Sequence, residues 1–139
     1  MPWPGGKNPY RFVKAGRAPD LGDYFWRSSW ERNVARYLKY LECTGAIQGW
    51  AYEPMKFTFP RGAGYIPDFR IDTVCGEQVW WEVKGRPNRA SQAKANRMAR
   101  YYPDVKLALL LADDYRRLER HYAALIPEWE GGHQELILE

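Results

Sequence analysis

The chain has 139 residues, of which 45% are hydrophobic and 27% are charged, and its formal net charge is +4 at pH 7. This balance excludes an intrinsically disordered protein and predicts one globular domain with its own core. The positive charge is compatible with a polyanionic partner and, equally, with an ordinary basic surface.

Cysteine usage and hydropathy narrow the class of protein further. The two cysteines, Cys43 and Cys75, are not part of a CxxC pair. We therefore expect free thiols in a reducing compartment and no structural zinc site. The N-terminus lacks the apolar stretch of a secretory signal, and no segment approaches the length of a membrane span. These features predict a cytoplasmic protein without a membrane partner.

The N-terminal segment, residues 1–26, is rich in Pro and Gly and carries Lys7, Arg11, Lys14 and Arg17. It predicts an irregular basic arm in front of a single domain that spans residues 27–139. Two interpretations stay open for the arm. It lies along a DNA backbone or reaches a partner subunit, or it is simply a frayed terminus.

The first predicted helix lies in SSWERNVARYLKYLECTG, residues 28–45. Trp30, Val34, Leu38 and Leu41 recur at helical spacing, and Gly45 is a suitable end. Short apolar runs in WAYEPMKFTFP, residues 50–60, then predict one or two strands. The strongest strand candidates follow, YIPDFRID at 65–72 and QVWWEVKG at 78–85, with a turn at 73–77 between them.

The C-terminal half alternates helix and strand. We expect a helix in residues 91–102 capped by Ser91, a buried strand in 106–112, and a helix in 113–125 capped by Asp113 or Asp114. The tail at 130–139 suits an edge strand. The order helix, three-strand meander, helix, strand, helix predicts an α/β domain with a central mixed sheet flanked by helices. A strand–helix–strand connection implies one parallel pair in that sheet.

Charged side chains interrupt the two strongest strand candidates. Because side chains alternate along a strand, Trp80, Glu82 and Lys84 share one face. A hairpin with an even register places Asp68 on the same face, and a slip of one residue removes it. The sequence does not fix that register.

Two converging carboxylates repel each other unless a cation lies between them. Mg²⁺ binds through one or two carboxylates together with water and phosphate, and it promotes phosphodiester hydrolysis. Lys84 would orient the attacking water or stabilise the transition state. The alternative is a solvated ion-pair ladder on a surface hairpin. The apolar strands, with Pro67 before the acid and Gly85 after the lysine, favour the metal site.

Glu31 is a third candidate acid, near the start of the first helix. Ser28 and Glu31 form a capping-box pattern, which explains the glutamate without any chemistry. Helical spacing also places Glu31 at the edge of the buried face, within reach of a metal at the sheet. Arg32 and Arg36 are expected to face solvent or phosphate.

Four blocks of the chain, RSSWERNVARYL, WAYEP, YIPDFRI and WWEVKG, resemble the phage endonuclease I type of Holliday junction resolvase. That group belongs to the PD-(D/E)XK nuclease superfamily, with the archaeal resolvases and TnsA-like transposase subunits. The resemblance covers roughly residues 27–111. It implies a restriction-endonuclease-like core of αβββαβ order. It also implies an Mg²⁺-dependent endonuclease, with Mn²⁺ as a substitute, acting as a homodimer that nicks opposed strands of four-way DNA junctions in the host cytoplasm.

The resemblance also implies roles for individual residues. Asp68 would be the central metal ligand, Glu82 and the Val83 carbonyl further ligands, Lys84 the catalytic lysine, and Glu31 an acid that joins the metal from the first helix. Gln92 and Lys94 lie where related nucleases carry polar residues near the site. The full set of expected DNA contacts is Arg32, Arg36, Arg86, Arg89, Gln92 and Lys94. No nucleotide cofactor is expected.

Two rival functions stay open. The first keeps the nuclease core and changes the substrate, giving a restriction-like, mismatch or transposition endonuclease. The second is a basic DNA-binding module without activity. Glu53 lies near an apolar strand, so it is expected either at the surface or in support of the site. Neither His121 nor His133 has a partner for catalysis in the sequence.

Overall fold

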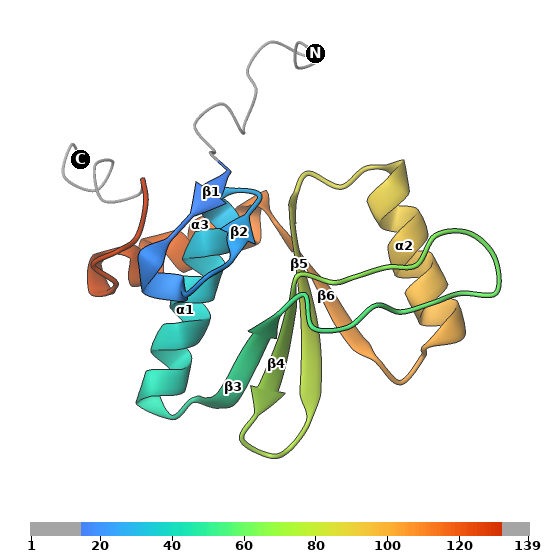
Figure 1. The fold of residues 1–139 in the computed structure, drawn as a ribbon, viewed down its shortest axis with the longest axis horizontal. Coiled ribbons are helices and arrows are strands. Elements are labelled where there is room, and N and C mark those ends of the chain that lie inside the picture. The colour runs from blue at the N-terminus through green and yellow to red at the C-terminus, as the bar shows by residue number, and fades with distance from the viewer. Residues whose placement is uncertain (1–14, 132–139) are drawn as a thin grey trace, which may run out of the picture.

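The computed structural model describes residues 15–131, which form a four-stranded sheet between helices (Figure 1). Helices α1 and α3 cover one face of the sheet and α2 covers the other. This arrangement confirms the predicted α/β class and the mixed sheet. The elements are α1 (Ser29–Thr44), β3 (Ile47–Tyr52), β4 (Phe69–Thr73), β5 (Gln78–Gly85), α2 (Arg89–Tyr101), β6 (Lys106–Leu111), α3 (Ala112–Tyr122) and the short helix η2 (Ala123–Leu125).

The sheet has the strand order β3-β4-β5-β6. The first three strands form an antiparallel meander, and β5 pairs with β6 in parallel, as the sequence predicts. In the hairpin, Phe69 lies opposite Trp81 and Asp72 lies opposite Gln78. This is the even register, and continued by one residue it brings Asp68 opposite Glu82.

Alternation along the strands divides the apolar residues between two cores. Phe69 and Ile71 pack with Val34 and Leu38 of α1 on one face. On the other face, Trp80 packs with Met98 of α2 and with Phe57 and Tyr65 of the loop between β3 and β4. That loop, residues 53–68, replaces the second strand that was allowed for in residues 50–60. It closes on itself through an antiparallel bridge between Phe57 and Tyr65.

Residues 15–26 are part of the folded core. They form β1 (Gly16–Arg17), the short helix η1 (Pro19–Leu21) and β2 (Phe25–Trp26). Trp26 is fully buried, and its ring centroid lies 4.1 Å from that of Tyr52. The prediction of an irregular arm is therefore wrong for this stretch, because its few apolar residues close the core beside α1. Residues 1–14 of the predicted arm lie outside the described part of the chain.

The helix ends correct two predicted caps. Ser28 caps α1 and Gly45 ends it with φ +81°, both as expected. Helix α2 begins at Arg89, and its cap is Asn88 rather than Ser91. Helix α3 begins at Ala112, so neither aspartate is its first cap. The Asp114 carboxylate instead accepts a 3.0 Å hydrogen bond from the backbone N–H of Leu111.

Three further expectations concern the ends and the class of the chain. The predicted C-terminal edge strand and His133 fall largely or wholly beyond residue 131, outside the described residues. Cys43 and Cys75 are free and exposed, as expected. Within residues 15–131, no helix has the length and apolar character needed to cross a membrane.

Candidate active site

An open pocket of about 390 Å³ lies where β4 begins, β5 ends and α1 starts. All four predicted catalytic residues line it, although they come from three separate elements. Glu31 comes from the first turn of α1, Asp68 from the residue before β4, and Glu82 and Lys84 from the end of β5. The remaining lining residues are Arg27, Ser28, Trp30, Ile66, Val83, Gly85 and Lys94.

Asp68 and Glu82 are joined by hydrogen bonds across the hairpin. The backbone N–H of Asp68 donates to Glu82 Oε1 at 3.1 Å, and the N–H of Val83 donates to Asp68 Oδ2 at 2.8 Å. Each carboxylate is thus held by the backbone of the other strand. Asp68 itself is buried, with 3% of its surface exposed. The hydrogen bonds fix the direction in which the two acids point.

Strand β5 bends directly after Lys84. Gly85 has φ +64°, in the left-handed region that favours glycine, and the pairing of β5 with β6 shifts register between Val83 and Gly85. The bend ends the regular ladder at the pocket. It leaves Lys84 at the pocket wall beside the two acids.

The carboxylate of Glu31 is available to the pocket because the helix cap does not use it. Ser28 Oγ accepts the hydrogen bond from the Glu31 backbone N–H at 3.1 Å. The Glu31 carboxylate instead accepts a 3.3 Å hydrogen bond from the Tyr52 hydroxyl. The two competing roles of the capping-box pattern are therefore divided between Ser28, which caps, and Glu31, whose carboxylate lines the pocket.

Burial perturbs all three acids. Loss of hydration, together with the nearby charge of Asp68, raises the pKa of Glu31 to about 7. Burial also raises the pKa of Asp68, to which the charge of Glu82 adds, and burial raises the pKa of Glu82. Without added positive charge, the pocket therefore retains protons at a pH where exposed carboxylates are fully ionised.

Arg27 contributes positive charge to the pocket, and it was not among the residues predicted for the site. Its Nη2 lies 3.2 Å from Asp68 Oδ1, its Nε lies 3.6 Å from Glu31 Oε1, and it also pairs with Glu53. Glu53 is therefore part of the site's charge network, which is the supporting role that its position near an apolar strand left open. The spacing of Arg27 and Glu31, four residues apart across a helix start, is the only sequence signal for this contact.

Lys94 of α2 lines the pocket, and the buried Tyr65 contacts two of its residues, Glu82 and Lys94. The Tyr65 hydroxyl hydrogen-bonds to the Glu82 carboxylate, and burial raises the pKa of that hydroxyl far above its ordinary value. Lys94 Nζ lies 5.4 Å from the centre of the Tyr65 ring. Lys94 lines the same pocket as the predicted acids, and its role there stays a prediction. Tyr65 was missed because nothing in its sequence position distinguishes it from a core aromatic.

Arg32 and Arg36 do not face solvent, so that prediction is wrong. Arg32 is 4% exposed and its Nε pairs with Glu130 at 2.6 Å. Arg36 is 7% exposed and its Nε pairs with Asp20 at 2.9 Å, so both guanidinium groups are structural. The reason is tertiary, because residues 16–21 and Glu130 cover the face of α1 that the helix alone would leave open.

The other expected DNA contacts lie around the pocket rather than in it. Arg86 lines a neighbouring pocket together with Trp30. Arg89 and Gln92 are exposed on the first turns of α2, and Gln92 Nε2 donates to Asn96 at 2.9 Å. Their contact with DNA stays a prediction, as does the role of the Val83 carbonyl as a metal ligand.

The donor set fits a hard divalent cation. The pocket offers carboxylate oxygens without histidine or thiolate, which is the ligand chemistry of Mg²⁺ or Mn²⁺. Among residues 15–131, no three acidic, histidine or cysteine side chains converge into a preformed metal cage. Mg²⁺ does not require one, because it is usually held by one or two carboxylates with water and phosphate. The Asp68–Glu82 pair satisfies that smaller requirement.

The chain matches no protein-family model, and no curated protein matches it. A function for this chain is therefore inferred from the residues that line the pocket and from the resemblance of the four sequence blocks to junction resolvases.

Proposed function

We propose that this protein is a metal-dependent endodeoxyribonuclease with a restriction-endonuclease-like core, and that it cuts four-way DNA junctions by hydrolysing phosphodiester bonds. The observation that carries the proposal is the hydrogen-bonded pair of Asp68 and Glu82, with Glu31 and Lys84 on the wall of the same pocket. The acids and the lysine of this pocket support the proposed reaction class. The choice of the junction as substrate rests on the resemblance of the four sequence blocks to junction resolvases.

Asp68 and Glu82 would hold the divalent ion, with the Val83 carbonyl and Glu31 as further donors. When bound, the ion would neutralise charge on the phosphate and acidify a water molecule. The backbone hydrogen bonds from the opposite strand keep both carboxylates oriented before substrate arrives. Such preorganisation lowers the reorganisation that the reaction needs.

The cationic side chains of the pocket would act on the phosphodiester. Lys84 would orient the attacking water and donate to a phosphate oxygen that gains negative charge in the transition state. Lys94, which also lines the pocket, would bind a second phosphate oxygen. In this scheme Lys84 acts on the reacting group, and Lys94 positions the strand.

A homodimer is part of the proposal. One chain would cut one strand at its candidate active site. Paired cuts in opposed strands therefore require two such sites related by a twofold axis. Light scattering would give the molar mass of the free protein and of its junction complex. A single chain per junction would contradict paired cutting.

The direct test is to incubate the protein with an end-labelled four-way junction and, separately, with linear duplex of the same arms, in Mg²⁺ or in EDTA. We expect metal-dependent nicks placed symmetrically in opposed strands of the junction, and slow or no cutting of the duplex. Equal cutting of both substrates would support the restriction-like, mismatch or transposition alternative. Binding without cutting in any divalent metal would support the inactive DNA-binding module.

Two substitutions test the assignment of the acids. Asp68→Asn and Glu82→Gln keep side-chain size and remove charge, so we expect junction binding in EDTA to be retained while cleavage falls by at least about a thousandfold. Arg117→Gln, on an exposed position of α3, is the matched control for loss of one charge and should cut normally. Cleavage by either acid variant at the wild-type rate would refute the mechanism.

A further inference from the structure

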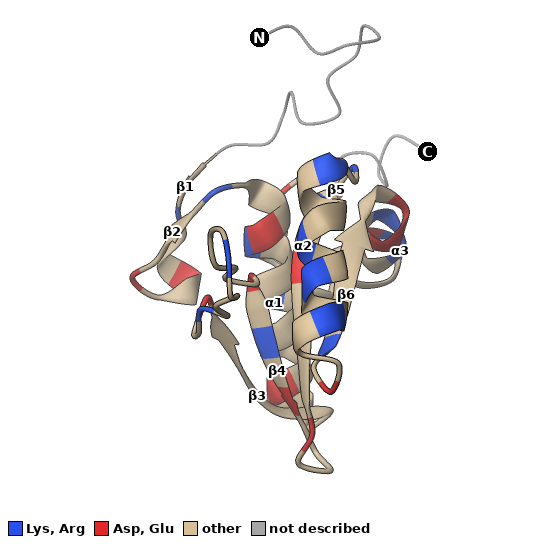
Figure 2. Ribbon diagram, turned by 90° about the vertical axis from the view of Figure 1, so that its right-hand side faces the viewer, with Lys and Arg blue, Asp and Glu red and all other residues tan. Residues whose placement is uncertain are grey.

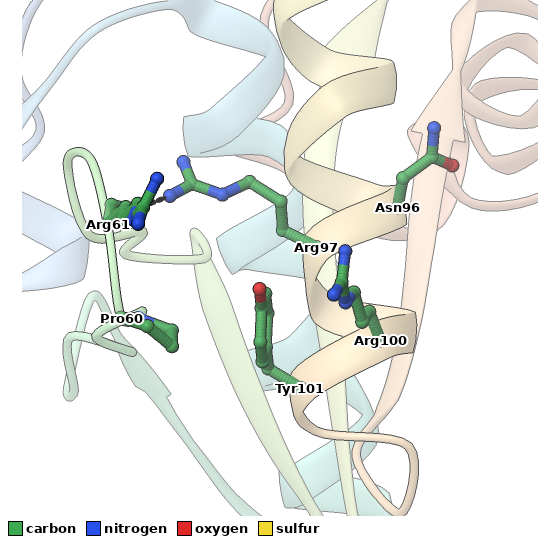
Figure 3. Close-up of a pocket in the computed structure, with 6 residues that line it drawn as sticks. All are labelled: Pro60, Arg61, Asn96, Arg97, Arg100 and Tyr101. Carbon is green, nitrogen blue, oxygen red and sulfur yellow. Dashed lines mark hydrogen bonds between the residues drawn. The ribbon is translucent and has the colours of Figure 1, made fainter.

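A second pocket, of about 560 Å³, lies between α2 and the loop 53–68 (Figure 3). It is separate from the candidate active site, and three of its six lining residues are arginines. We call it the arginine groove. It is lined by Pro60, Arg61, Asn96, Arg97, Arg100 and Tyr101.

Side-chain contacts fix the shape of the arginine groove. Arg97 Nη1 donates to the Ala63 carbonyl at 3.4 Å, and its Nη2 donates to the Arg61 carbonyl. Its guanidinium carbon also lies 4.4 Å from the centre of the Phe59 ring. Gly62, between the two acceptors, has φ +82°, and a Cβ there would lie 2.8 Å from Arg97 Nη2. One arginine thus holds the loop against α2.

The groove carries positive charge that the protein does not neutralise. Within residues 15–131, no carboxylate forms an ion pair with Arg61, Arg97 or Arg100. By contrast, Arg32 and Arg36 are each paired with an acid. Arg61 and Arg100 are exposed, and the Arg100 guanidinium lies 5.1 Å from the centre of the Tyr101 ring. Three unneutralised guanidinium groups around one groove favour an anion with several charges.

The same two elements line both the groove and the candidate active site. Ile66 of the loop and Lys94 of α2 line the active-site pocket, whereas Arg61 and Arg97 line the groove. Lys and Arg recur along α2 (Figure 2). From Lys94 to Arg100 the helix rises by about 9 Å. A DNA strand advances by about 3.4 Å per nucleotide, so this distance corresponds to two or three nucleotides.

We propose that the arginine groove binds the phosphodiester backbone of the DNA strand whose scissile phosphate lies in the active-site pocket, two to three nucleotides from the cut. The identification of the scissile phosphate rests on the proposed nuclease function, whereas the binding of DNA phosphate by the groove does not require cleavage. Guanidinium groups suit this ligand because their planar donors match phosphate oxygens. The groove contacts the backbone only, so it adds affinity and register but no base specificity.

The test measures equilibrium binding of a labelled four-way junction in EDTA over a range of KCl concentrations, so that metal and cleavage play no part. The variant Arg61→Gln/Arg100→Gln removes two charges while leaving Arg97 and its loop contacts in place. We expect its affinity to fall about tenfold or more and the slope of log K against log[KCl] to decrease by about two. The matched control, Arg117→Gln/Arg120→Gln, removes two charges from exposed positions of α3, which lies on the other face of the sheet, and should keep the slope.

The single variants Arg61→Gln and Arg100→Gln should each reduce the slope by about one. They test the contribution of each arginine even where the double variant does not fold. Circular dichroism of each variant checks its fold. Binding by the double variant equal to that of the control would overturn the proposal, as would failure of the wild type to bind DNA. A failure of the nuclease proposal can be distinguished from a failure of the groove proposal. If only the nuclease proposal fails, the wild type would bind DNA with the expected salt dependence but would not cut it in Mg²⁺ or Mn²⁺.

Phosphate replacement locates the contact along the strand. A methylphosphonate, which lacks the negative charge, is placed at one position at a time near the mapped cut. We expect weakened binding by the wild type at the position two or three nucleotides from the cut, and no further weakening at that position in the double variant. Loss of binding at the same positions in both proteins would place the groove away from this strand and contradict the proposal.

Discussion

The guanidinium of Arg27 lies 3.2 Å from Oδ1 of Asp68. Asp68 is the acid that the sequence resemblance predicts as the central metal ligand. The Arg27 side chain also pairs with Glu31 and Glu53, so it is a counter-charge for three acids at the pocket. A divalent ion held by Asp68 would compete with this contact. Arg27 therefore offsets the charge of the acids without metal and would oppose the proposed metal binding.

Substitution of Arg27 tests this competition. We expect Arg27→Gln to bind Mn²⁺ about two- to fivefold more tightly than the wild type, as expected from an ion pair whose arginine is largely exposed. Isothermal titration with Mn²⁺ gives the affinity without any cleavage assay. Weaker Mn²⁺ binding by the variant would show that Arg27 supports the metal site rather than competing for it.

The second prediction concerns the effect of metal on stability. A ligand that binds only the folded state raises the free energy of unfolding. Mg²⁺ or Mn²⁺ should therefore raise the melting temperature, and more strongly at pH 8 than at pH 5.5, where the buried acids carry protons that compete with metal. Asp68→Asn should abolish the increase, whereas Glu77→Gln, at the exposed far end of the hairpin, should keep it. An equal increase in Asp68→Asn would exclude this pocket as the metal site.

The third prediction concerns pH and Glu31. Its pKa is about 7 in the folded protein against an ordinary value of 4.5, so between these values the folded state binds more protons than the unfolded state. The free energy of unfolding of the metal-free protein should therefore fall as the pH rises from about 4.5 to 7, and the loss is complete above that range. In Glu31→Gln this fall should be smaller by roughly 3 kcal/mol, since each unit of pKa difference corresponds to about 1.4 kcal/mol. Denaturant unfolding at several pH values measures it, and an unchanged pH profile would contradict the raised pKa.

The fourth prediction concerns Asn33, which is fully buried in α1. Its amide nitrogen donates to the Tyr115 hydroxyl at 2.7 Å and to the Glu130 carbonyl at 2.9 Å, and its oxygen accepts from Arg36 at 3.0 Å. Asn33→Ala would remove these hydrogen bonds from a buried site, while Arg36 keeps its pairs with Asp20 and Glu130, and should lower the free energy of unfolding by roughly 2–4 kcal/mol.

Two comparisons sharpen the Asn33 result. Tyr115→Phe removes one hydrogen bond of the network, so its cost should be about 1 kcal/mol. Arg117→Gln, on the exposed side of the same helix as Tyr115, should cost less than about 0.5 kcal/mol. A cost for Asn33→Ala no greater than that of Tyr115→Phe would show that water replaces the lost amide.

The order of the elements was predictable because hydrophobic periodicity is a local property of the chain. The helical spacing of apolar residues in α1 and the alternation of side chains in β5 are both visible in contiguous residues. The same alternation puts Glu82 and Lys84 on one face. The segment 15–26 was mispredicted for the same reason. Its Pro and Gly content is that of a loop, and the burial of Trp26 depends on Tyr52 and Phe69, which are distant in sequence.

The sequence by itself determined the α/β class, the meander, the parallel pair and the four residues Glu31, Asp68, Glu82 and Lys84 as candidates. Only the tertiary structure decided the register that places Asp68 opposite Glu82, the pairing of Arg27 with the acids, and the burial of Arg32 and Arg36. The physical reason is that side-chain periodicity is encoded in neighbouring residues, whereas strand register and charge pairing depend on groups that only folding brings together.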